Sequence, residues 1–170
     1  MGRNSAMEAS DAQAAPVSIL RLPRAAYLAL RAHAEETYPH ECCGVLLGCP
    51  TPEGWRVEEA VRAANARTDS AHNRYSIAPG ELVKIETGAR RRGLQIAGFH
   101  HSHPDHAAHW SATDLAEAHW LGCSYVITAV AQGKAAATNS FLLAGTKEEN
   151  KRFVPEVIRV DDQVIEAAGD

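Results

Sequence analysis

The chain has 170 residues, of which 45% are hydrophobic and 22% are charged, so one domain with a buried core is expected. Its formal net charge of −4 leaves no broad basic surface for a nucleic acid, and no apolar run is long enough to span a bilayer. The first residues lack the apolar stretch of a secretory signal. We therefore expect a cytoplasmic protein that binds neither nucleic acid nor membrane.

Hydrophobic periodicity and turn residues predict a mixed order of helices and strands. The expected elements are a strand at 17–22, a helix at 23–36, paired strands at 45–48 and 56–63, a short strand at 75–77, a helix at 79–91, a strand at 94–100, a helix beginning at 111, strands at 124–131 and 136–143, and a strand at 157–160 that closes the sheet. This order indicates an α/β fold, in which helices flank a mixed central sheet. The domain is expected over residues 17–160, between tails at 1–16 and 161–170.

The most informative segment is GFHHSHPDHAAHWSATD, residues 98–114. It contains His-Ser-His-Pro, with His101 and His103, and then Ser-x-x-Asp, with Ser111 and Asp114. Two histidines and one carboxylate form a three-ligand zinc set that leaves one coordination position open for water. An open position is typical of a catalytic zinc rather than a structural one.

The spacing of this motif has a structural reason. The residues before it are mostly apolar and predict a buried strand, in which side chains two apart share a face. His101 and His103 should then point to one side and His100 to the other, and Pro104 should end the strand. A loop that returns to the strand end can deliver Asp114, one helical turn after the start of the next helix, as a third ligand.

Simpler interpretations exist for each part of the motif. Ser111 and Asp114 alone fit a helix N-cap with an acidic third position. The histidine pair alone fits a solvated, histidine-rich loop. The joint occurrence of all positions in this order favours a catalytic metal site.

The motif resembles the JAMM motif of the MPN+ metalloprotease family, which has the form E…H-S-H-x7-S-x-x-D. The upstream glutamate of that motif is matched by Glu41, within the segment PHECCGVLLG at 39–48. Residues 65–66 and 74–77 resemble the middle of compact bacterial members. The departure is Trp110, which stands where many members have proline before the serine.

The resemblance implies the MPN fold, related to cytidine deaminases, and one Zn²⁺ per chain held by His101, His103 and Asp114. Glu41 is then the general base and Ser111 the group that stabilises the oxyanion. The implied reaction is hydrolysis of the amide bond after the C-terminal Gly-Gly of a ubiquitin-like or sulfur-carrier protein. A homodimer is left open.

Other residues that could bind metal are expected to have structural roles. The cysteines form no Cys-x-x-Cys pair and are interpreted as buried thiols: Cys42, Cys43, Cys49 and Cys123. A redox or inhibitory role of Cys42, beside Glu41, is the less favoured alternative. His33 lies beside the apolar stripe of the first helix, which favours a boundary position, and His106 and His109 are interpreted as loop residues near the cleft.

Several alternatives to this function remain at the level of the sequence. One is an MPN scaffold without catalysis, although such scaffolds typically lack the ligands, and another is a metallopeptidase of different substrate. A nucleoside deaminase requires His-x-Glu and Pro-Cys-x-x-Cys, which are absent. The DNA-repair-associated branch of the superfamily usually has asparagine between the histidines, where this chain has Ser102.

Overall fold

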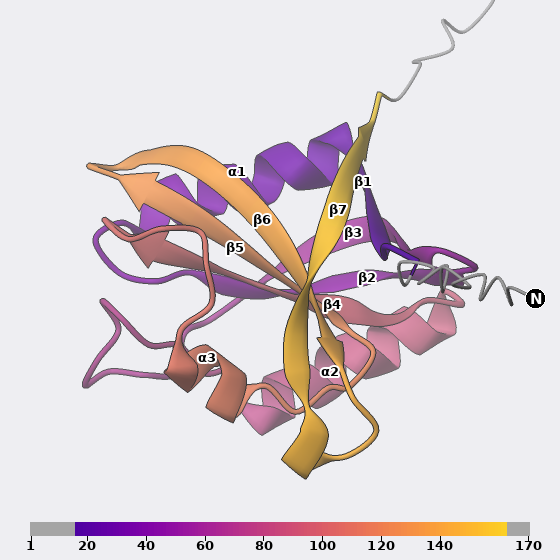
Figure 1. Ribbon diagram of the computed structural model, residues 1–170. Helices are drawn as coiled ribbons and strands as arrows, with labels where there is room; N and C mark the ends of the chain where they lie inside the picture. The colour runs from indigo at the N-terminus through magenta and orange to yellow at the C-terminus, as the bar shows by residue number, and fades with distance from the viewer. Residues whose placement is uncertain (1–15, 163–170) are drawn as a thin grey trace, which may run out of the picture.

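Helices and strands alternate along the chain much as the residue pattern predicts. The computed structural model describes residues 16–162 (Figure 1). The elements are β1 (Ile19–Pro23), α1 (Arg24–Thr37), β2 (Cys43–Thr51), β3 (Gly54–Ala63), α2 (Pro79–Arg91), β4 (Gln95–Pro104), α3 (Ala112–Glu117), β5 (Ser124–Ala131), β6 (Lys134–Ala144), the 3₁₀ helix η1 (Glu148–Asn150) and β7 (Arg152–Asp161). The tails predicted at 1–16 and 161–170 lie outside the described residues, apart from residue 16 and residues 161–162.

The seven strands form one mixed sheet that closes into a barrel in the order β1-β3-β2-β4-β5-β6-β7. The β2–β3, β5–β6 and β6–β7 pairs are antiparallel, whereas β4 and β5 run parallel on either side of the loop that carries α3. The last strand pairs in parallel with the first, from Ile19 opposite Val157 to Pro23 opposite Asp161. The predicted α/β class and the closing role of residues 157–160 are confirmed.

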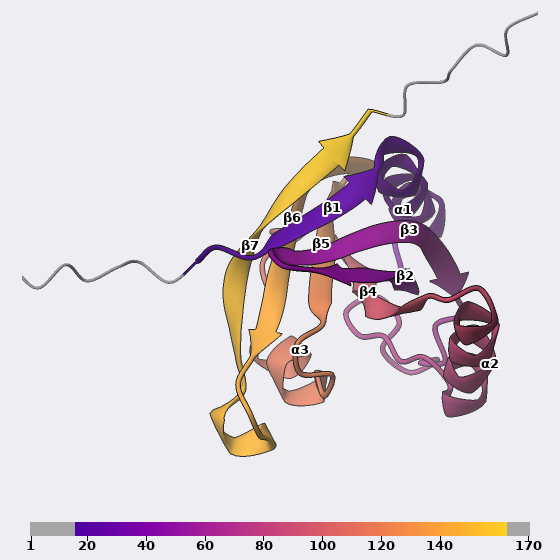
Figure 2. The ribbon, with the colours of Figure 1, turned by 90° about the vertical axis from the view of Figure 1, so that its right-hand side faces the viewer.

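Two apolar clusters cover the two faces of the sheet. Helix α1 buries Leu30 against a cluster that includes Leu22, Leu46 and Val126. Helix α2 lies on the other side of β2 and β4 (Figures 1 and 2), where Ala89 joins a larger cluster built around aromatic side chains. Strand β4 lies between these layers, so its two faces meet different surroundings.

An irregularity in the pairing of β4 with β2 determines to which face of the sheet the residues at the C-terminal end of β4 point. The register between β2 and β4 shifts between Leu46 and Leu47, where Gly98 and Ile96 are the respective partners. Ile96 and Phe99 therefore both join the cluster on the α2 side, although side chains three apart in a regular strand point to opposite faces. His101 and His103 follow Phe99 on the same alternation and face away from α1.

The segment at 64–78 differs from the prediction, because residues 75–77 form no strand. The side chain of Asn65 forms hydrogen bonds with the backbone of this segment. Its Oδ1 accepts hydrogen bonds from the backbone N–H groups of Arg67 (3.0 Å) and Ser76 (3.1 Å), and its Nδ2 donates to the carbonyl of Arg74 (3.0 Å). Backbone N–H and C=O groups that pair with a side chain in this way do not need hydrogen bonds to a neighbouring strand.

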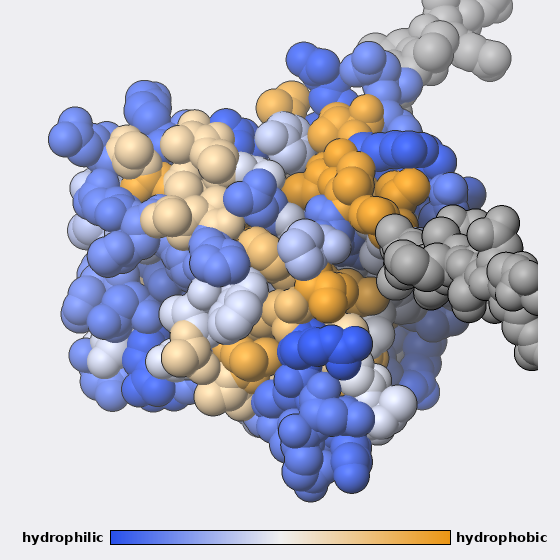
Figure 3. Space-filling model, in the orientation of Figure 1, coloured by the Kyte–Doolittle hydropathy of each residue, from blue (hydrophilic) through white to orange (hydrophobic). Residues whose placement is uncertain are grey.

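Exposed apolar side chains occur beside and on the first and last strands, β1 and β7, which pair with each other. Val17, Val157 and Val160 are exposed, and Figure 3 shows hydrophobic residues gathered over β1 and β7 next to the grey atoms. None of the helices in the described part of the chain has the length and apolar character needed to cross a membrane.

Candidate metal centre

Three side chains converge at the C-terminal end of β4. His101 and His103 are buried, and their Nε2 atoms lie 3.0 Å apart. Asp114 reaches them from α3, with Oδ1 at 3.3 Å from the Nε2 of His101 and Oδ2 at 3.4 Å from that of His103. The structure thus brings together the three residues that the sequence suggested as metal ligands.

The separations of these atoms fit a single zinc ion. Ligands about 2.0–2.1 Å from zinc in a tetrahedral arrangement lie about 3.4 Å from one another. The observed 3.0, 3.3 and 3.4 Å are close to this spacing. The donor set of two imidazoles and one carboxylate also matches zinc, since it leaves a fourth position for water.

The two histidine rings are oriented by different neighbours. The Nδ1 of His103 lies 2.8 Å from the carbonyl oxygen of Ala107, so its N–H can donate there and leave Nε2 free to bind a cation. His101 is held instead by the ring of Tyr75, which stacks on it with 4.6 Å between ring centroids. The Nδ1 of His101 is buried and has no hydrogen-bond partner among residues 16–162.

Asp114 has a second role at the start of α3. Its Oδ2 accepts the backbone N–H of Ser111 at 2.6 Å, and the Ser111 hydroxyl accepts the N–H of Asp114 at 3.0 Å. This capping box fixes the carboxylate beside the imidazoles, so the capping interpretation and the ligand interpretation describe the same arrangement. Burial raises the pKa of Asp114, but hydrogen bonds with His101 and His103 outweigh it and hold the pKa well below its usual range.

Glu41 is buried close to this group without belonging to it. Burial raises the pKa of its carboxyl to about 8, while the charge of His103 lowers it and that of Asp114 raises it. The backbone at Glu41 is fixed on both sides, since its N–H donates to the carbonyl of Ala71 at 2.7 Å and its carbonyl accepts from the Asn65 amide at 3.4 Å. A carboxyl held in this way can exchange protons near neutral pH.

The remaining histidines of the motif lie apart from the three ligands. His100 points to the other face of β4, as expected. His106 and His109 are exposed, and neither belongs to a metal-binding group within residues 16–162. Trp110, the departure noted from the motif that this segment resembles, packs against Phe153 with 5.7 Å between ring centroids and so anchors the loop to the core.

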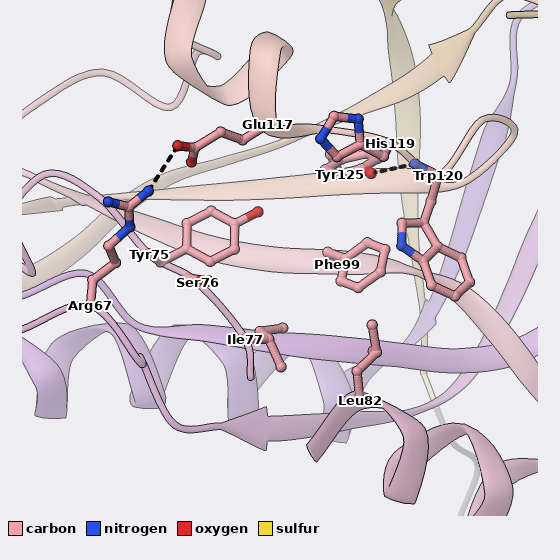
Figure 4. A pocket seen from close by; sticks show the side chains of 10 residues that line it. All are labelled: Arg67, Tyr75, Ser76, Ile77, Leu82, Phe99, Glu117, His119, Trp120 and Tyr125. Atoms are coloured by element: carbon pink, nitrogen blue, oxygen red, sulfur yellow. Dashed lines mark hydrogen bonds and ion pairs between the residues drawn. The ribbon is translucent and has the colours of Figure 1, made fainter. Parts of the chain in front are cut away.

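A cavity of about 340 Å³, whose lining is drawn in Figure 4, lies next to the ring of Tyr75 that stacks on His101. Tyr75, which stacks on His101, forms part of its wall, and Phe99 lies further along. Glu117 pairs with Arg67 at 3.1 Å at one end, and Trp120 lies at the other. The cavity is therefore mostly aromatic and aliphatic, with a charged pair at one end.

Comparison with known proteins identifies the family. Residues 23–144 match the family of prokaryotic homologs of the JAB domain. The chain belongs to the prokaryotic JAB family. This result confirms the resemblance to the JAMM/MPN+ family at the level of the family and the fold.

Relatives of this JAB-family chain include one curated enzyme and two solved structures. Desampylase of Haloferax volcanii is 35% identical over 89 residues, which are 52% of this chain, and the match spans 62% of that protein. A protein from Desulfitobacterium hafniense has a TM-score of 0.68 at 25% identity, over 85% of this chain and 95% of that one. A protein from Salinibacter ruber has a TM-score of 0.62 at 34% identity, over 85% and 92% of the two chains.

Two residues of this JAB-family chain contact the site without being candidate ligands, and the sequence did not indicate these contacts. Tyr75 and Asn65 fall within the segments that resembled family members, but the sequence assigned them no role. Their effect depends on contacts with His101 and Glu41, which come from other parts of the chain. The signal for this loop in the sequence was the resemblance of residues 65–66 and 74–77 to family members.

Proposed function

We propose that this chain is a zinc-dependent metallopeptidase that hydrolyses the amide or isopeptide bond after the C-terminal Gly-Gly of a ubiquitin-like or sulfur-carrier protein. The main support is the convergence of His101, His103 and Asp114 at zinc-like spacing, with a buried carboxyl, Glu41, close by. The match to a desampylase supports an enzyme in the same family.

The proposed roles of the protein groups follow from their positions. Zinc at the three ligands supplies Lewis acidity, which polarises a carbonyl and lowers the pKa of a water to about 7. Glu41 takes a proton from the attacking water, whose oxygen forms a bond to the carbonyl carbon. As the carbon–nitrogen bond breaks, Glu41 returns the proton to the leaving amine. The positive charge of the cation would lower the pKa of Glu41 towards the neutral range.

Ser111 is proposed to stabilise the negative charge that develops on the substrate oxygen. Its hydroxyl oxygen already accepts the backbone N–H of Asp114, so its own proton is free to donate. The side chain is exposed at the start of α3, next to the carboxylate that faces the imidazoles. A substrate oxygen at the metal centre would therefore meet a hydroxyl donor.

The fold limits how an extended substrate tail can bind. Each of the seven strands within residues 16–162 has a neighbour on both sides, so none of them offers an entirely free edge for an added strand. The irregular segment at 64–78 instead lines the cavity with Arg67, Tyr75, Ser76 and Ile77. We propose that the Gly-Gly tail lies there, because glycines let a backbone approach a narrow site closely.

The test is a cleavage assay on carrier fusions that differ only in the tail. Wild-type enzyme should release a peptide or lysine adduct from a Gly-Gly tail, and a bulky residue at the penultimate position should block the reaction. Glu41→Gln should keep zinc and lose roughly 10²–10⁴ in rate, and Ser111→Ala should keep zinc and lose roughly 10²–10³.

Different failures have different meanings. Equal turnover of Gly-Gly and bulky tails would reject the carrier specificity and leave a general metallopeptidase. Loss of zinc in Glu41→Gln would make Glu41 a ligand and overturn its role as base. A zinc-loaded wild-type protein without activity on any amide would favour a scaffold.

A further inference from the structure

A second group of potential ligands lies on the opposite face of β4. His33 comes from α1, Cys42 from the residues just before β2, and His100 from β4. Each side chain offers one ligand atom, and these atoms lie within 4.8 Å of one another. The group shares no residue with the proposed catalytic centre.

Two nitrogen atoms of this group are buried and have no hydrogen-bond partner within residues 16–162. They are the Nδ1 of His33 and the Nε2 of His100. His100 is only 2% exposed. Leaving a polar atom buried and unpaired costs about 1–3 kcal/mol, so each such atom calls for a partner. The ligand atoms of the two imidazoles and the thiol, which lie within 4.8 Å of one another, share one partner if a cation lies between them.

The surroundings hold this arrangement in place. A Cβ at Gly44 would lie 2.1 Å from the Nε2 of His100, so only glycine leaves room for that ring. The rings of His33 and His100 pack edge to face, with 5.9 Å between centroids. The Ser102 hydroxyl accepts the backbone N–H of Cys42 at 2.8 Å, which fixes the segment that carries the thiol.

We propose that His33, Cys42 and His100 form a second cation site, which binds Zn²⁺ through two imidazoles and one thiolate. Nitrogen and sulfur donors of this kind suit a borderline-soft metal and do not suit Mg²⁺ or Ca²⁺. On binding, the Cys42 thiol loses its proton to solvent and the sulfur lone pair forms the bond to the metal. Both histidines bind in the neutral form, so they release no proton at neutral pH.

The nearby charges allow a cation at this position. Burial lowers the pKa of His33 and raises the pKa of Cys42 to about 11, and the positive charge of Arg62 acts on both groups by lowering each pKa. Arg62 is engaged in a two-bond ion pair with Glu36, at 2.6 and 3.1 Å, which offsets that charge. The outer side of the site is thus close to neutral overall.

A metal here would connect parts of the fold that meet at the proposed catalytic base. It would join α1 to β4 and to the backbone immediately after Glu41. The site would therefore act as a structural link rather than a place of catalysis. This role is independent of the reaction proposed above.

The experiment measures metal binding by the full chain after chelation and dialysis. The double variant His101→Ala/His103→Ala removes the first site, and it should still bind one equivalent of Zn²⁺. With Co²⁺ as the probe, the same variant should show the near-ultraviolet sulfur-to-metal charge-transfer band of a thiolate ligand. Circular dichroism verifies that each variant is folded.

Further variants identify the ligands within that background. Cys42→Ser should abolish the cobalt band and weaken binding by more than the roughly 10–100-fold typical of losing an outer-shell partner. His33→Gln, at the partly exposed side of the site, should weaken it similarly. The matched control is Cys43→Ser, which removes a neighbouring buried thiol and should leave both band and affinity unchanged.

The proposal is overturned if the folded double variant binds no zinc, or if the cobalt band survives Cys42→Ser. Either result would show that the three side chains do not form a metal site. Neither depends on cleavage activity, so failure here is separate from failure of the proposed function.

Discussion

The ring of Tyr75 lies stacked on the ring of His101, with 26° between the two planes. This contact connects the irregular segment at 64–78 to the proposed metal centre. His101 has no partner for its Nδ1 within the described residues, so the stacked ring and the Asp114 carboxylate, 3.3 Å from its Nε2, are the contacts that orient it. The position of the loop and the geometry of the ligand are therefore coupled.

Replacing Tyr75 should weaken zinc binding through this contact. Tyr75→Ala removes the stacked ring, and the loss of about 0.5–1.5 kcal/mol corresponds to roughly two- to tenfold weaker affinity. Tyr75→Phe keeps the ring and should bind zinc as tightly as wild type. Competition with a chromophoric chelator measures both. Equal affinity in the alanine variant would show that the ring does not orient His101.

Two substitutions of Asp114 should separate its capping role from its ligand role. Asn retains an oxygen that can accept the Ser111 N–H but loses the charge, whereas Ala loses both. Zinc affinity should fall in both variants. In chelated protein at about pH 9, where both imidazoles are neutral, only the alanine variant should lose about 1 kcal/mol of unfolding free energy. Equal stability of the two variants in urea would argue against the cap.

Glu41→Gln should stabilise the chelated protein, and the effect should grow with pH. The folded pKa of about 8 lies above the ordinary value of 4.5, so the folded state binds the proton more tightly than the unfolded state does. The free energy of unfolding of the wild-type protein therefore falls as the pH rises from about 4.5 to 8. The decrease is up to a few kcal/mol, on the order of 1.4 kcal/mol for each pKa unit. Thermal unfolding of both proteins across this range tests it. A constant difference at all pH values would contradict the raised pKa.

Asn65→Ala should loosen the segment at 64–78. The substitution leaves the N–H groups of Arg67 and Ser76 without their acceptor, at a cost of about 1–3 kcal/mol. Amide hydrogen exchange in the segment should accelerate, and turnover should fall because the backbone of Glu41 loses a contact. Asn73→Ala, an exposed asparagine of the same segment, is the control. Unchanged exchange in Asn65→Ala would reject the role of this side chain.

Features that depend on local spacing could be predicted from the sequence. Alternation along a strand placed His101 and His103 on one face and His100 on the other, and the Ser-x-x-Asp spacing indicated the cap that fixes Asp114. The strand predicted at 157–160 closes the sheet by pairing with β1.

Features that depend on distant contacts could not be predicted. Residues 75–77 have strand-forming side chains, yet they form no strand, and the N–H of Ser76 donates to the Asn65 side chain instead of to a neighbouring strand. The approach of His33 to Cys42 and His100 requires α1 to pack across the sheet, and no local pattern indicates where a helix surface will dock. The effect of the β4 irregularity is likewise visible only once β2 lies beside it.

The closure of the barrel makes the two ends of the chain interdependent. β1 and β7 pair with each other and so close the barrel. Both lie almost entirely outside residues 23–144, the range that matches the family. A polypeptide trimmed to that range would contain all five motif residues and still expose the edges of β3 and β6, which invite aggregation. Because the first and last strands are far apart in sequence, their pairing is also expected to come late and slowly in folding.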